Sequence, residues 1–114
     1  MDAYLRGLGF MPSEYMRLVK SKAKSQGYSP TSISFAEDGI HKFQIIRPDG
    51  LVRRFGRVGY GDFLIWSFLE RQGSVPLGTA ATKRRVFHAS HERIKGRWRN
   101  DPFSPNALAL RLLW

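Results

Sequence analysis

The chain has 114 residues, of which 42% are hydrophobic, contains no cysteine and carries a formal net charge of +10. This length and apolar content are typical of one globular domain and argue against extensive disorder, and the absence of cysteine excludes disulfides and thiolate metal sites. The excess of 19 Lys and Arg over 9 Asp and Glu favours a polyanionic partner: nucleic acid above all, and otherwise an acidic protein or an anionic membrane.

Residues 1–11 contain two glycines in a weak apolar pattern, which predicts a flexible or partner-ordered N-terminal arm. Residues 12–114 are expected to form a single globular domain. The first residues include an acid and no continuous apolar stretch, so we expect no secretory signal peptide. The longest apolar run, near Phe63 to Leu69, is too short to cross a bilayer, so no membrane partner is expected.

The first long helix is predicted to begin at Pro12, a residue favoured in a first helical turn, and to end at Gly27. Its apolar stripe comprises Tyr15, Leu18, Val19 and Ala23. Arg17, Lys20, Lys22 and Lys24 make its other surface basic, which is also the usual character of a solvated helix face.

Three extended segments follow, over residues 32–36, 40–46 and 51–56, and the turn sequences Glu-Asp-Gly and Pro-Asp-Gly separate them. This order predicts a three-stranded antiparallel meander. Its buried face is expected to hold Ile33, Phe35, Phe43, Ile45, Leu51 and Phe55. In this register Arg53 shares the face of Phe55, whereas Arg54 points to the opposite side.

The stretch GRVGYGD, residues 56–62, is the richest in glycine. It lacks the Gly-Lys-Ser/Thr ending of a phosphate-binding loop, and its glycines do not follow the dinucleotide-binding spacing. We therefore expect a tight strand-to-helix turn with Asp62 as the N-cap of the next helix. A backbone cradle for phosphate is the alternative, although a negative cap would repel an anion there.

Three more helices are predicted: an almost wholly apolar one over residues 63–71, a longer one over 79–95, and a C-terminal one that begins at Ser104-Pro105. The fold class is therefore α+β, with an N-terminal helix, a three-stranded antiparallel meander and then three helices. The C-terminal helix contains one charged residue, Arg111, so it either packs inward or buries a second apolar side in a homodimer.

The most basic stretch is KRRVFHASHERIKGRWR, residues 83–99, with seven Lys or Arg, two His and a single acid. On a helical wheel its core face is expected to comprise Ala80, Val86, Phe87, Ser90 and Ile94. The spacing of Arg84, His88, His91 and Lys95 predicts a continuous cationic stripe. Trp98 lies between two arginines and is suited to base stacking or to wedging into a groove, or else folds back onto the core.

We therefore expect a nucleic-acid-binding surface in this stretch, extended by the basic residues around the third strand if the sheet lies beside the helix. The expected binding residues are Lys83, Arg84, Arg85, His88, His91, Lys95, Arg97, Trp98, Arg99, Arg53, Arg54 and Arg57. A solvated helix face is the alternative interpretation.

No catalytic site is predicted, because the chain has neither an Asp/Glu-x-Lys nuclease motif nor a nucleophile elbow. Most acids lie where turns or caps require them. His88 and His91 supply half a metal site, and Lys95 stands where a zinc-protease motif needs its second His. We therefore expect no enzyme activity, no metal and no cofactor.

Three stretches together resemble a family of small basic proteins encoded by large eukaryotic DNA viruses, including marseillevirus-like ones. They are FAEDGIHKF (residues 35–43), RFGRVGYGDFLIWS (54–67) and FHASHERIKGRWRNDPFSPNALALRLLW (87–114), and the resemblance extends over about residues 12–114. It implies a viral protein that is packaged in the virion or is active early in infection, located in the virion and the infected host cell. It implies no specific activity, and no site residue follows from it.

The expected function is thus non-enzymatic, largely sequence-independent binding of nucleic acid, with DNA favoured over RNA, by a genome-associated or virion-packaged protein. The alternative is a virion structural or host-interaction module that binds an acidic protein partner. A homodimer through the N-terminal arm or the C-terminal helix is compatible with both.

Overall fold

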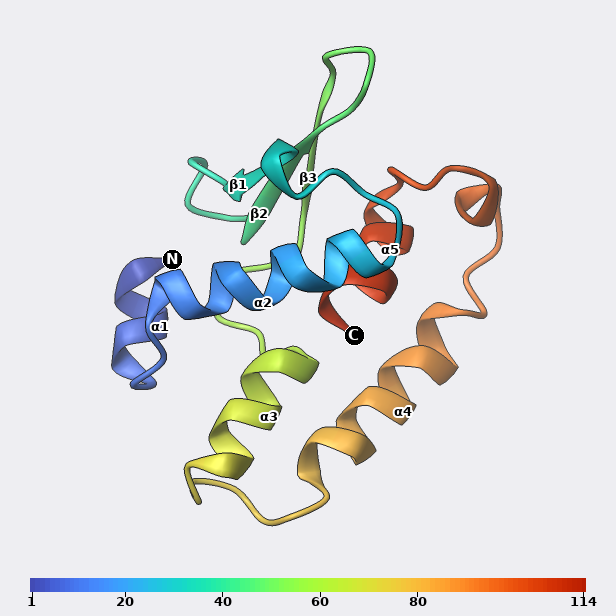
Figure 1. Ribbon diagram of the computed structural model, residues 1–114. Coiled ribbons are helices and arrows are strands. Elements are labelled where there is room, and N and C mark those ends of the chain that lie inside the picture. Colours follow the sequence, from blue (N-terminus) through green and yellow to red (C-terminus); the bar gives the residue numbers. More distant parts are fainter.

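A computed structural model describes residues 1–114 as a mixed helix and sheet structure about 42 Å long (Figure 1). The helices are α1 (Asp2–Gly7), α2 (Pro12–Ser25), α3 (Phe63–Arg71), α4 (Thr79–His91) and α5 (Pro105–Leu108). The strands are β1 (Ile33–Phe35), β2 (Phe43–Ile46) and β3 (Val52–Phe55). Two 3₁₀ turns, η1 (Pro30–Ser32) and η2 (Trp98–Asn100), and a π-helical segment, η3 (Ala109–Leu113), complete the chain.

The predicted α+β class is confirmed, with a helix, an antiparallel sheet of order β1-β2-β3 and then further helices. Phe43 lies opposite Phe35 on one side and Phe55 on the other, and its ring stacks on both at 5.4 and 5.6 Å. This cross-strand aromatic row fixes the register, because a slip of one residue would turn it toward solvent. Leu51 does not join the row: it is 52% exposed, because it belongs to the turn before β3.

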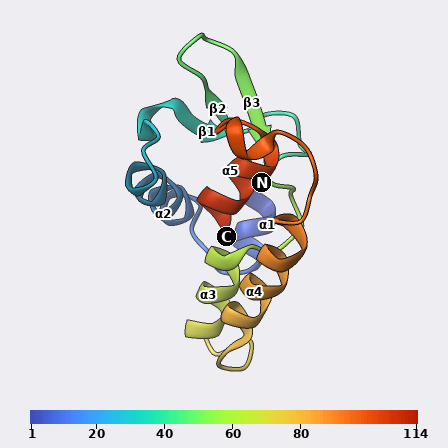
Figure 2. The same ribbon diagram turned by 90° about the vertical axis from the view of Figure 1, so that its right-hand side faces the viewer.

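Helix α2 lies across the sheet, and α3 and α4 form a pair at the opposite end of the molecule from the β2–β3 hairpin (Figures 1 and 2). Tyr15 of α2 contacts the Phe43 ring at 5.2 Å. The C-terminal segment packs against both α2 and β3. The core is therefore closed by the last residues of the chain rather than by the sheet alone.

Residues 1–11 differ from the expected arm. They form α1 and the turn after it, with Leu5 and Phe10 buried in the core. Phe10 stacks on Phe68 of α3 with ring centroids 4.2 Å apart. Other apolar residues of this segment, Met1, Tyr4 and Leu8, pack against the core as well, and α2 and α3 supply the surface that orders them.

The C-terminal helix buries its apolar residues within the chain. Those residues are Leu108, Leu110, Leu112, Leu113 and Trp114. The helix widens from α to π geometry at Ala109, which changes the angular spacing of the residues beyond that point. Neither this segment nor α1 leaves the apolar face on which the expectation of a homodimer rested.

The glycine-rich stretch is the predicted tight connection between β3 and α3. Gly56 and Gly59 have φ of +73° and +91°, and Asp62 is the N-cap of α3, accepting a hydrogen bond from the Ile65 amide at 2.9 Å. Gly56 also allows close packing: a Cβ there would lie 2.9 Å from Leu113 Cδ1 and 3.1 Å from Lys42 Cβ.

Asp62 is 0% exposed and joins three parts of the core. Its carboxylate accepts a hydrogen bond from Lys42 Nζ at 2.9 Å and another from the Tyr15 hydroxyl. Burial, and then the neighbouring Asp62 charge, raises the pKa of the Tyr15 phenol well above its usual range, so Tyr15 stays protonated and donates. The ion pair thus has the additional hydrogen bonds that a buried charge requires.

Replacing Asp62 with Ala should lower the free energy of unfolding by about 3–5 kcal/mol, because Lys42 would remain buried without its counter-charge. Urea denaturation measures this loss. Asp2 is the control: its carboxylate is exposed in a weak surface pair with Arg6, so Asp2→Ala should change stability by less than about 0.5 kcal/mol. Equal effects of the two substitutions would contradict the role assigned to Asp62.

Gly56→Ala and Gly59→Ala separate backbone strain from packing. Both glycines have positive φ, so each substitution should cost about 1 kcal/mol from strain. Gly59 has open space around it, whereas Gly56 lies against Leu113 and Lys42. Gly56→Ala should therefore cost a further ~1–3 kcal/mol from overpacking. Thermal denaturation of both variants gives the comparison, and a larger loss at Gly59 would refute it.

Candidate nucleic-acid interface

Helix α4 is positioned by α3. It starts after Gly78, whose φ is +91°, and the Glu70 carboxylate of α3 accepts a hydrogen bond from the Ala80 amide at 3.0 Å. An acidic group at the start of a helix satisfies a free amide and complements the helix dipole. The same contact orients α4 along α3, with Ala80 buried between them.

The buried face of α4 differs from the predicted one. Val86 is 62% and Ile94 45% exposed, whereas Phe87 stacks on Trp114 at 4.3 Å and on His91 at 3.6 Å. The C-terminal Trp114 therefore selects the face that packs inward. A helical wheel cannot identify this partner, because Trp114 lies far from α4 in the sequence. Ile94 lies beyond the helix, which ends at His91 instead of Lys95.

The two histidines of the predicted cationic stripe are consequently turned toward the protein. His88 Nδ1 lies 3.0 Å from a Glu92 carboxylate oxygen, and His91 Nδ1 lies 3.0 Å from the Phe87 carbonyl. Arg84 lies over the Phe63 ring of α3 at 4.9 Å. Lys95 is separated from this group, because the helix ends before it.

Lys83 and Arg85 lie on either side of that stripe, and both are exposed. Lys83 covers the Trp66 ring of α3 with its Nζ 4.9 Å from the centroid. Arg85 lines a shallow hollow with Arg84 and Phe63. Both residues keep their charges accessible to solvent.

Trp98 is half-buried, and its ring is already in contact. Its indole Nε1 donates to the Ile94 carbonyl at 2.7 Å, and the Arg99 guanidinium lies 4.4 Å from its ring centroid. Arg99 also donates to the Glu92 carbonyl. A base could stack on this face of Trp98 only by displacing Arg99. Arg97, in contrast, is exposed and makes no ion pair.

No Lys or Arg of residues 83–99 forms a salt bridge. All seven are exposed: Lys83, Arg84, Arg85, Arg93, Lys95, Arg97 and Arg99. The single acid of the stretch, Glu92, faces His88. The positive charge that the sequence concentrates here is therefore not neutralised within the protein.

Two of the three basic residues around β3, Arg53 and Arg54, do not extend this surface. Arg53 and Arg54 belong to β3, at the end of the molecule away from α4, and Arg54 lies 3.7 Å from Asp38 (Figure 1). Arg57, by contrast, does approach α4: it lines a second pocket together with Phe87 and His91 of α4 and with Trp114. The sheet therefore does not lie beside α4 at Arg53 and Arg54, because α5 rather than α4 packs against β3.

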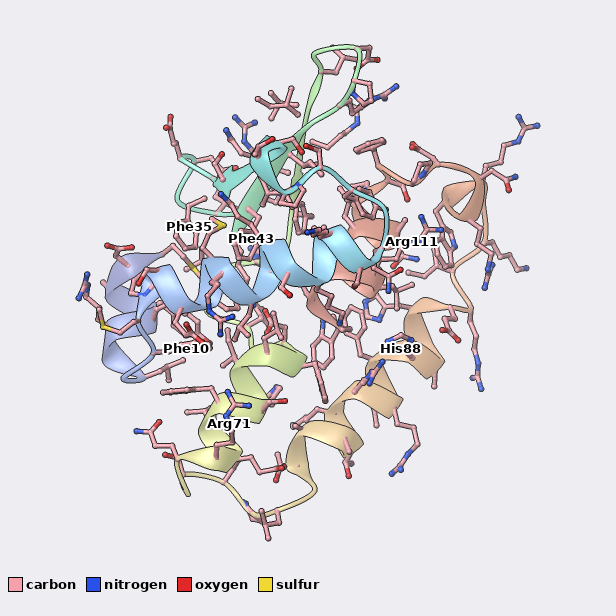
Figure 3. The ribbon with its side chains drawn as sticks, in the orientation of Figure 1. Phe10, Phe35, Phe43, Arg71, His88 and Arg111 are labelled. Atoms are coloured by element: carbon pink, nitrogen blue, oxygen red, sulfur yellow. The ribbon has the colours of Figure 1, made fainter.

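Instead, cations from other elements join α4. A pocket of about 520 Å³, here called the cationic pocket, lies between α2, α4 and the C-terminal segment. Its lining residues are Lys22, Gln26, Arg84, His88, Glu92, Trp98, Arg99, Leu110, Arg111 and Trp114. Figure 3 shows His88 and Arg111 on the side of the molecule where the end of α2 approaches α4.

Lys22 and Arg111 are the basic pocket residues that sequence reasoning did not assign to the site. Lys22 was one basic residue on an apparently solvated helix, and Arg111 was the lone charge of an apolar one. Burial, and then repulsion from Arg84, lowers the pKa of Lys22, as expected for a cation close to another cation. Only the approach of α2 to the C-terminal segment could have revealed this grouping.

No protein-family model, curated protein or solved structure shows a significant match to this chain. No three His, Asp or Glu side chains come together in a way that could hold a metal ion. None of the helices combines the length and apolar character needed to cross a bilayer.

Phe87→Ala should lower the free energy of unfolding by about 2 kcal/mol, because it removes a half-buried ring and two aromatic contacts. Val86→Ala, on the exposed side of α4, should change it by less than about 0.5 kcal/mol. Chemical denaturation of the two variants tests the orientation of α4. Comparable losses for the two variants would instead restore the face predicted from the helical wheel, which included both residues.

Proposed function

We propose that this protein binds nucleic acid without catalysing a reaction, through sequence-independent contacts between its basic residues and phosphates. The observation that supports this proposal most directly is the stretch of residues 83–99, whose seven Lys and Arg are exposed and lack acidic partners. Unneutralised cations that lie close together release counterions from a nucleic-acid backbone on binding. They provide affinity without reading the bases.

The contacts to phosphate are assigned chiefly to the outer residues of this stretch. Arg85, Lys95 and Arg97 are exposed and have no hydrogen-bond or ion-pair partner. Trp98 is assigned a supporting role, since it holds Arg99 rather than a base. Arg53 and Arg54 are left out of the interface because they lie on β3, away from α4, and Arg57 is left out because it lines the second pocket rather than the exposed stretch of residues 83–99.

Within this proposal, DNA is the preferred partner over RNA. The resemblance to proteins of large DNA viruses supports a genome-associated or virion-packaged role in the infected cell. It also supports a viral genome as the physiological polymer.

The binding of an acidic protein is a second candidate function. Val86 and Ile94 are exposed among the cations, and apolar anchors surrounded by charge are typical of protein interfaces. Such an interface would depend on Val86 and Ile94 as well as on charge, whereas phosphate binding would depend on charge alone.

Fluorescence anisotropy with a random duplex of about 20 base pairs, from about 50 to 300 mM salt, tests the first proposal. The logarithm of the affinity should fall linearly with the logarithm of the salt concentration. Lys95→Gln/Arg97→Gln should reduce the slope by about 2, close to 0.9 for each lost phosphate contact. Arg53→Gln/Arg54→Gln removes the same charge from another surface and should leave the slope near that of the wild type.

Absence of binding at the lowest salt, with circular dichroism showing an intact fold, would refute the nucleic-acid proposal. Equal effects of the two double variants would show that net charge alone, and not residues 83–99, determines binding. The first result would favour the acidic-protein candidate, for which Val86→Ser then becomes the informative variant.

A further inference from the structure

The cationic pocket differs from the exposed basic surface in both shape and composition. Four elements contribute to it five basic side chains and one acid: Lys22 of α2, Arg84 and His88 of α4, Arg99 of η2, Arg111 of η3, and Glu92. The exposed surface comes from one continuous stretch, whereas the pocket is assembled by the tertiary fold.

Neutral groups hold two of these cations in position. Arg84 lies over the Phe63 ring at 4.9 Å, and Arg99 lies over the Trp98 ring at 4.4 Å while it donates to a backbone carbonyl. Aromatic faces orient a guanidinium by cation–π attraction and leave its charge in place. The arginines are therefore ordered in advance for an anion, which reduces the entropy lost when one binds.

Arg111 and Lys22 complete the other side of the pocket. Arg111 Nη1 donates to the Tyr28 hydroxyl at 3.2 Å, and the remaining guanidinium donors have no partner. Lys22 is half-buried and makes neither a hydrogen bond nor an ion pair. A partly buried ammonium beside Arg84 is an unfavourable arrangement that an anion would relieve.

His88 lines the pocket with a partly buried ring. Its Nδ1 faces Glu92, and its Nε2 is buried with no hydrogen-bond partner, the only buried side-chain nitrogen or oxygen in that condition. A ligand in the pocket cannot reach this shielded nitrogen without a movement of the ring, so the contacts to an anion are assigned to the arginines and to Lys22 rather than to His88.

We propose that the cationic pocket binds a phosphate monoester, the terminal phosphate of a nucleic-acid strand. This inference rests on the proposed function and specifies its ligand. A monoester carries up to two charges and three free oxygens, which suits several convergent cations, whereas a backbone phosphate carries one charge. The pocket is also concave, so it admits a chain end more readily than the middle of a strand.

The test compares internally labelled single strands of one sequence that carry a 5′-phosphate, a 3′-phosphate or no terminal phosphate. A phosphorylated strand should bind about tenfold or more tightly than the unphosphorylated one, as charge-assisted hydrogen bonds at one site predict. Lys22→Gln/Arg84→Gln should abolish this preference. Neither residue donates a hydrogen bond within the protein, so the fold should be retained, as circular dichroism would verify.

Lys95→Gln/Arg97→Gln is the matched control, with the same loss of charge outside the pocket. It should weaken binding of all three strands and preserve their ratio. Arg111→Gln, on the opposite wall, is the second pocket variant and should also reduce the preference.

A free nucleoside monophosphate, compared with the nucleoside alone, distinguishes the two sources of the ligand by NMR. Displaced amide signals near Lys22 and Arg111, together with a raised Lys22 pKa, would support the pocket even if the strands showed no end preference, and would identify a free nucleotide as the ligand. If no strand binds, the proposed function fails, and the monophosphate still tests the pocket. Equal binding of the three strands without signal displacement by the monophosphate would overturn the inference.

Discussion

The buried carboxylate of Asp62 is the constraint on which the arrangement of the chain depends. It satisfies the first turn of α3, compensates the buried ammonium of Lys42 at the start of β2, and accepts the hydroxyl hydrogen of Tyr15 from α2. Three segments distant in sequence thereby meet at one residue. A charge in this position is tolerated because each group that contacts it is a hydrogen-bond donor, and the cost of desolvation is offset only while all three remain in place.

This constraint extends to the charged surface through α3. Asp62 sets the start of α3, and Glu70, two turns further along, contacts the first turn of α4. The rings of Phe63 and Trp66 on α3 then lie beneath Arg84 and Lys83. The basic helix is consequently held at a defined angle to the core, and its cations rest on aromatic rings.

The protein keeps its positive charge available by positioning many basic side chains with neutral partners. Aromatic faces, a tyrosine hydroxyl and backbone carbonyls hold Arg84, Arg99 and Arg111, where carboxylates would have neutralised them. Unpaired charge opposes folding through self-repulsion. The extensive aromatic core and the closure of the fold by the C-terminal segment supply the opposing stability.

Local sequence patterns predicted most of the elements, although not α1: turn residues separate the strands, Pro12 and Asp62 mark helix starts, and the apolar spacing identifies the sheet face around Phe43. These features are local, since they depend on backbone preference and on the period of two or 3.6 residues. The sequence also located the most basic stretch, because charge is a property of composition. The face of α4 that packs inward depends instead on the distant Trp114, and only the folded chain brings Lys22 and Arg111 to one pocket. Contacts between residues so far apart in the chain arise from packing, which no local pattern encodes.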